Sequence, residues 1–135
     1  MKTDDNAYVR RATAWSLANY DNQIVLEPLI NALKNDVAAV RLWSSSSLAE
    51  IGNVSLKNAQ LAAEQLLISL KIDNEPGVRS NCIWSLCRLY EKLNNTFQES
   101  FVDECTKIAL FDKEPSVMEE AKTALDSMGM QGFYN

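Results

Sequence analysis

The sequence predicts an all-α fold, an α-solenoid or α-α superhelix of about seven helices that occupies residues 1–135 as a single domain. Three observations support this prediction: a nine-residue pattern occurs four times, its copies start 31, 38 and 39 residues apart, and its apolar residues follow the helical period. A period of this length is typical of stacked supersecondary units that bury one continuous seam. The copies are Val9–Leu17, Val40–Leu48, Val78–Leu86 and Val117–Leu125.

Each copy is expected to form an amphipathic helix. When the first Val is counted as position 0, positions 0, 4, 7, 8 and 11 fall within about 100° of one another on a helix. These positions hold apolar or small residues in nearly every copy, with only Ser or Ala at position 7. Small residues allow a neighbouring helix to approach closely, and each buried aliphatic side chain contributes roughly 1.5 to 3 kcal/mol.

Start and stop signals delimit the first three helices, which are expected over residues 7–20, 23–34 and 37–51. The alternative for the second helix is a later start, near Leu26, because Pro28 inside a helix would cost about 3 kcal/mol. Gly52 and Asn53 provide a C-terminal stop for the third helix.

The remaining four helices are expected over residues 59–72, 75–92, 97–111 and 115–128. Asn94 and Asn95 break the chain between the fifth and sixth helices, and Glu119 and Glu120 suit the start of the seventh, where acidic groups favour the helix dipole. The aromatic residues of the tail, at positions 133 and 134, are expected to fold back over the open end of the stack.

Aspartate and arginine recur around each copy. Aspartates precede the copies where an N-cap accepts free amide protons, and Pro76 and Pro115 suit a first turn. The Arg at position 1 points sideways, where it is expected to pair with the capping Asp of the adjacent unit. The residues of this expected structural ladder are Arg10, Arg41, Arg79, Asp36, Asp73 and Asp112.

Composition excludes several classes of function. The net charge is −5 and the 13 basic residues are scattered, which argues against nucleic acid and anionic membranes as partners. The chain has no histidine, so the usual general base and metal ligand are missing, and we expect no catalytic motif, no metal and no permanently bound cofactor. The absence of a signal peptide or long apolar run predicts a cytoplasmic protein with reduced cysteines.

A candidate binding groove lies opposite the buried stripe, at positions 2, 6 and 9, with positions 3 and 10 on its flank. All three tryptophans of the chain fall on these positions, and exposed aromatic rings are typical of a binding surface. The alternative is that the rings pack between units, above all at position 3. The predicted groove residues are Arg11, Trp15, Trp43, Glu50, Asn81, Trp84, Cys87 and Arg88, and Leu42, Ser46, Ser80, Glu119 and Glu120 share these positions.

Cys87 has two interpretations. It is either an accessible thiol that holds a ligand transiently or an unreactive cysteine, and the second is favoured because only Arg88 is near enough to lower its pKa. Cys82 and Cys105 fall on apolar stripes and are expected in the core.

The motif D-x-x-x-V-R followed by small residues and Leu resembles a HEAT repeat, over nearly the whole chain. The segments VRRATAWSL and VRLWSSSSL are similar to the HEAT-like repeats of phycobilisome lyases of the E/F type. The HEAT resemblance implies that the Val-Arg helix lines a concave surface. The lyase resemblance implies a phycobiliprotein subunit as partner, or a second HEAT-repeat lyase subunit, and a linear tetrapyrrole (phycobilin) held transiently during bilin attachment.

Three functions remain open at this point. One is a phycobilin lyase subunit or accessory chaperone, the only enzymatic role that the resemblance offers. Another is a non-enzymatic scaffold that binds a protein in its concave groove, and a third is a phycobilisome degradation factor. Each of them has a protein partner.

Overall fold

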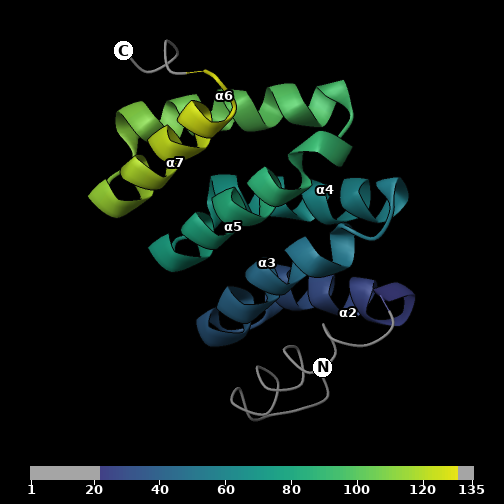
Figure 1. Cartoon of the computed structure of the whole chain (residues 1–135). Helices are drawn as coiled ribbons and strands as arrows, with labels where there is room; N and C mark the ends of the chain where they lie inside the picture. Colours follow the sequence, from purple (N-terminus) through teal and green to yellow (C-terminus); the bar gives the residue numbers. More distant parts are fainter. Residues whose placement is uncertain (1–21, 131–135) are drawn as a thin grey trace.

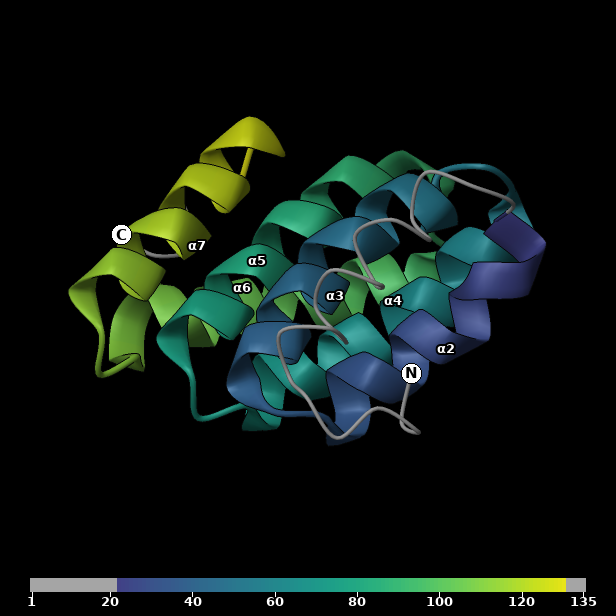
Figure 2. The ribbon, with the colours of Figure 1, turned by 90° about the horizontal axis from the view of Figure 1, so that it is seen from below.

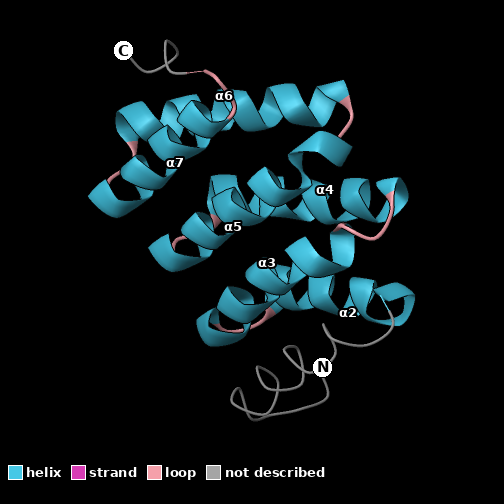
Figure 3. Cartoon of the chain, in the orientation of Figure 1, coloured by secondary structure: helices cyan, strands magenta, loops and turns pink. Residues whose placement is uncertain are grey.

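The computed structural model describes residues 22–130, with side chains from residue 25. The first predicted helix, with Arg10, Arg11 and Trp15, lies outside this range, as does the aromatic tail. The described residues form only helices and their connections (Figure 3). The elements are α2 (Asn22–Asn35), α3 (Ala38–Gly52), α4 (Leu56–Ile72), α5 (Pro76–Leu89), a 3₁₀ turn η1 (Tyr90–Lys92), α6 (Asn95–Phe111) and α7 (Pro115–Ser127).

The helices stack in two layers, which confirms the α-solenoid (Figures 1 and 2). Helices α2, α4 and α6 form one layer, and α3, α5 and α7, which carry the repeated pattern, form the other. Contacts between neighbours are denser within the α3, α5 and α7 layer than within the other. Closer spacing on one side curves the stack toward that side, so this layer forms the inner, concave face.

The predicted stripe is the side of each helix that packs into the core. In α3, Val40, Ser44, Leu48 and Ile51 are fully buried, and Ser47 is nearly so. The equivalent residues of α5 are all fully buried, and those of α7 are buried except at position 11. The amphipathic pattern therefore orients three successive helices in the same register.

A second stripe is buried that the helical pattern did not predict. Positions 5 and 9 face the next unit along the stack, and in α3 they hold Ser45 and Ala49, both fully buried. The same positions hold a buried Ile and the partly buried Cys87 in α5, but Lys122 and Asp126 in α7. The last described helix thus presents polar residues at the two positions that are buried in α3.

The aspartates before each copy are not N-caps, contrary to the sequence prediction. The N-cap positions are held by Val37, Glu75 and Glu114, none of which caps its helix through its side chain. Asp73 instead ends α4, where its amide donates to the Ser69 carbonyl, and its Oδ1 accepts from the Glu75 amide at 3.0 Å. The carboxylate therefore holds the turn between two helices, and its remaining lone pairs accept hydrogen bonds from Arg41.

The predicted bounds of α2 and the predicted end of α3 agree with the structure to within about one residue. Helix α2 starts at Asn22 and continues through Pro28, so the proline does not delay the start to Leu26. Helix α3 ends at Gly52 with Asn53 as its C-cap, as predicted, but Gly52 does not adopt a left-handed conformation. A Cβ there would lie 3.1 Å from Ala62 Cβ and from both Leu89 Cδ atoms, so this glycine is a point of close helix approach.

The other helix limits differ from the predictions by a few residues. Helix α4 starts three residues early, because the Ser55 hydroxyl accepts from the Asn58 amide and caps it. Asn94 caps α6 in the same way, through Phe97. At the end of α7, Gly129 adopts φ +75° and the Met130 amide donates to Leu125, which closes the helix.

Candidate groove on the concave face

A groove of about 450 Å³ crosses the concave face over α3, α5 and α7. The side chains that line it come from the pattern positions 2, 3 and 6, which point away from the core. Trp84 and Leu42 are about two-fifths exposed, at 42% and 39%, and Trp43 is partly exposed. The lining residues are Leu42, Trp43, Ser46, Ser80, Asn81, Trp84 and Glu120. The described tryptophans therefore meet in one cavity and are not enclosed in the core.

The Trp84 ring is held from one side by Arg88. The guanidinium carbon of Arg88 lies 5.0 Å from the ring centroid, and its Nη2 donates to Glu50 Oε1 at 3.1 Å. Both charged side chains are about half exposed, so the ion pair adds little stability. The ion pair restrains the Trp84 ring on α5 against α3, because Arg88 contacts the ring and Glu50 belongs to α3. A cation over an indole face contributes about 0.5 to 1 kcal/mol at an exposed site.

Hydrogen bonds between repeats fix the distance between α3 and α5 beneath the groove. Asn81 Nδ2 donates to the Leu42 carbonyl at 2.9 Å, and the Ser85 hydroxyl donates to the Ser45 carbonyl. Each bond joins a side chain of one unit to a backbone carbonyl of the previous unit. The two walls of the groove are therefore pre-positioned, and little ordering is needed when a ligand binds.

The arginines at position 1 form two rungs of a ladder at the edge of the stack. Arg41 donates from Nε to Asp73 Oδ2 at 2.8 Å and from Nη2 to Oδ1 at 3.1 Å. In the next rung Arg79 donates from Nη2 to Asp112 at 3.0 Å, while its buried Nε has no partner. The hydrogen bond with Asp73 raises the pKa of the Arg41 guanidinium, and burial opposes this shift.

Each arginine of the ladder also binds the turn that starts its own helix. Arg41 Nη1 donates to the Asp36 carbonyl, and Arg79 Nη1 donates to the Asp73 carbonyl, both at 2.9 Å. Asp73 is therefore shared by both rungs, through its carboxylate in one and its carbonyl in the other. These arginines hold successive units in register and do not line the groove.

Cys87 lies apart from the groove lining, although the sequence grouped it with the groove residues. Position 9 lies at about 180° on the helix, at the boundary between the groove and the next unit, and here the thiol packs partly buried against the core. Burial raises its pKa to about 11, with a smaller contribution from Glu120, while a hydrogen bond with Ser127 opposes the shift. A protonated, shielded thiol is a poor nucleophile.

The other two cysteines lie in the core, as predicted. Cys82 and Cys105 are fully buried, and burial raises the pKa of both thiols. Between residues 22 and 130 no group of His, Cys, Asp and Glu is arranged to hold a metal ion. No helix in that range has the length and apolar character to span a bilayer.

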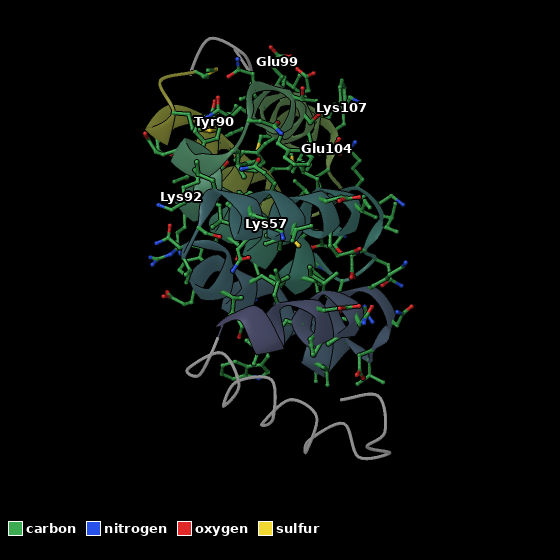
Figure 4. All side chains as sticks on the ribbon, turned by 90° about the vertical axis from the view of Figure 1, so that its right-hand side faces the viewer. Lys57, Tyr90, Lys92, Glu99, Glu104 and Lys107 are labelled. Atoms are coloured by element: carbon green, nitrogen blue, oxygen red, sulfur yellow. The ribbon has the colours of Figure 1, made fainter. Side chains whose placement is uncertain are left out.

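The outer layer offers a different surface. Lys57 of α4 and Glu99 and Lys107 of α6, labelled in Figure 4, are exposed charged side chains. The largest exposed apolar side chain in this layer is Phe111, at the end of α6 and 79% exposed. It lies outside the groove lining and is a useful control site.

The structure therefore brings together part of the predicted groove set. Trp43, Asn81 and Trp84 line the cavity, and Glu50 and Arg88 form an ion pair beside Trp84. Sequence reasoning missed the stacking of Arg88 on Trp84, although the i, i+4 spacing on one helix could have indicated it. It also missed the burial of position 9, which depends on the neighbouring unit. Arg11 and Trp15 lie outside the described residues.

The family of the chain follows from sequence comparison as well as from this architecture. The family model for HEAT repeats matches residues 1–87, well over half of the chain, so the protein belongs to the HEAT-repeat family. The matched region includes α2, α3, α4 and most of α5. No curated protein matches the chain significantly in sequence. HEAT repeats commonly mediate protein–protein interactions, and this chain has the architecture of such a module.

Proposed function

We propose that this protein is a non-catalytic binding module that holds a helix or loop of another protein in the groove over α3, α5 and α7. The observation that carries the proposal is the exposure of Trp84, with Leu42 and Trp43 beside it, on the side of the helices that points away from the core. Exposed indoles in a preformed cavity are favourable anchors for a partner.

The surrounding contacts support a role in binding more than one in stability. The Arg88 and Glu50 pair restrains the Trp84 ring without burying it. The stack itself is held elsewhere, by the ladder at its edge and by the buried seam. Asn81 also bonds α5 to α3, whereas the exposed apolar side chains of the groove are expected to contribute more to affinity than to folding.

A matched pair of variants tests the proposal. Trp84→Ala is expected to lower the free energy of unfolding by about 1 to 3 kcal/mol, since much of the ring is already in solvent. We expect it to weaken partner binding by at least about 2 kcal/mol, the size of an interface hot spot. The control Phe111→Ala removes an exposed ring from the outer layer and should leave binding unchanged.

The assay is affinity capture from the native host with wild-type protein and both variants, followed by quantitative mass spectrometry. Proteins retained by wild type and Phe111→Ala but lost from Trp84→Ala are the candidate groove partners. If Trp84→Ala instead destabilises the fold by more than about 3 kcal/mol, the ring belongs to the core and the proposed groove is wrong.

The second candidate function is assistance in bilin attachment to a phycobiliprotein, or in phycobilisome breakdown. It is supported by the similarity of VRRATAWSL and VRLWSSSSL to phycobilisome lyase repeats, and by a cavity whose indoles suit a flat conjugated pigment. Arg88, beside the groove, would exchange Glu50 for a propionate of the pigment.

Titration with phycocyanobilin tests this second candidate. Binding is expected to shift the pigment absorbance to the red and to quench tryptophan fluorescence, and Trp84→Ala should reduce both signals. If neither signal changes with the wild-type protein, the pigment function fails while the protein-binding function stands.

A further inference from the structure

We propose that the occupant of the groove is a basic amphipathic segment of the partner protein, with apolar side chains against the two indoles and a Lys or Arg against Glu120 of α7. This inference rests on the proposed function and adds the chemistry of the partner. Its basis is the distribution of charge around the groove.

Glu120 is the charged side chain in the groove lining. Among the described residues it forms no ion pair, whereas its neighbour Glu119 contacts Lys122 at 3.5 Å. Lys122 occupies position 5 of the pattern, so it extends from the end of the stack and not from the groove. The α7 wall of the groove therefore carries negative charge that no described cation neutralises.

The arginines described on α3 and α5 are already engaged. Arg41 and Arg79 bind the ladder aspartates, and Arg88 binds Glu50. The formal net charge of the chain is −5, so the background field is negative as well. A cationic segment is attracted to this groove, and an acidic segment is repelled from it.

The groove is also asymmetric along its length. The exposed apolar side chains lie on α3 and α5, and the acidic one lies on α7, the next helix along the stack. Packed helices are about 8 to 10 Å apart, and a helix rises about 1.5 Å per residue. A helical occupant that crosses the layer therefore places its basic residue roughly five to seven positions from the apolar anchor that contacts Trp84 of α5.

Panning of a random peptide library displayed on phage against the full chain tests this inference. Wild-type protein should enrich sequences with an aromatic or aliphatic anchor and a Lys or Arg roughly five to seven residues away. The best selected peptide, titrated by tryptophan fluorescence, should bind Glu120→Lys about tenfold more weakly, with Glu120→Gln in between, and its affinity should fall as salt is raised.

The outcomes separate this inference from the proposed function. Enrichment of apolar anchors with no preference for basic residues, or equal affinity of Glu120→Lys and wild type, overturns the charge inference and leaves the groove standing. Selected peptides that bind Trp84→Ala as tightly as wild type overturn the groove itself. Panning against Glu120→Lys should change the preferred charged residue of the selected peptides from Lys or Arg to Asp or Glu at the same spacing. A merely structural role of Glu120 does not predict this change.

Discussion

The ladder rung between Arg41 and Asp73 allows a quantitative prediction. Asp73→Ala removes the acceptor of two hydrogen bonds from Arg41 and of one from the Glu75 amide. The two side chains are only 18% and 7% exposed, so solvent screens the pair weakly. Loss of one partner from such a pair costs about 3 to 5 kcal/mol, because the remaining charge stays buried. We expect Asp73→Ala to lower the free energy of unfolding by about 3 kcal/mol or more.

The second rung is expected to be weaker. Asp112 accepts one hydrogen bond from Arg79 and one from the Glu114 amide, while Arg79 Nε has no partner. With one fewer charge-assisted bond, each of which contributes about 1.5 to 3 kcal/mol, Asp112→Ala should cost at least about 1 kcal/mol less than Asp73→Ala.

The assay is urea unfolding followed by far-ultraviolet circular dichroism, combined in a double-mutant cycle of Arg41→Met and Asp73→Ala. We expect a coupling energy of about 2 kcal/mol. The control is the same cycle on Arg88 and Glu50, which are 44% and 61% exposed and should couple by less than about 1 kcal/mol. A coupling for the ladder rung no larger than that of the exposed pair would refute the reasoning.

Two further predictions use single positions. The pKa of the Cys87 thiol is about 11, against an ordinary value of about 9. At about pH 8 this thiol should therefore react with a disulfide reagent roughly 100-fold more slowly than a free thiol. A fast reaction of Cys87 in a variant without the other cysteines contradicts this prediction. Because the folded-state pKa is raised, its contribution to stability is complete below about pH 9 and is lost between about pH 9 and 11, which urea unfolding in this window measures. Gly52→Ala should lower the free energy of unfolding by about 1 to 3 kcal/mol, since the new Cβ meets the fully buried Leu89 at 3.1 Å. In the matched control Gly77→Ala, the new Cβ meets only Cδ1 of the exposed Leu42, which has room to shift, so the substitution should raise stability by up to about 1 kcal/mol through helix propensity. Equal effects of the two substitutions would show that packing does not distinguish the sites.

The sequence by itself was sufficient for the period, the helical class and the side of each pattern helix that faces the core. The reason is that a stripe at positions 0, 4, 8 and 11 is a property of one helix, and its apolar residues recur in step along the chain. The same local pattern placed Trp43 and Trp84 away from the core, where the structure has them partly in solvent.

Only the tertiary structure decided the features that need two repeats at once. The burial of Ser45 and Ala49, the close approach at Gly52 and the position of Cys87 all come from the next unit, which a helical wheel of one unit does not contain. Likewise, an Asp before a helix has the local signature of an N-cap, but Asp73 binds an arginine 32 residues earlier and the amide of a turn. Long-range pairing determines which lone pairs a carboxylate uses. An N-cap is worth about 1 kcal/mol, whereas a buried charge left without its partner costs about 3 to 5 kcal/mol.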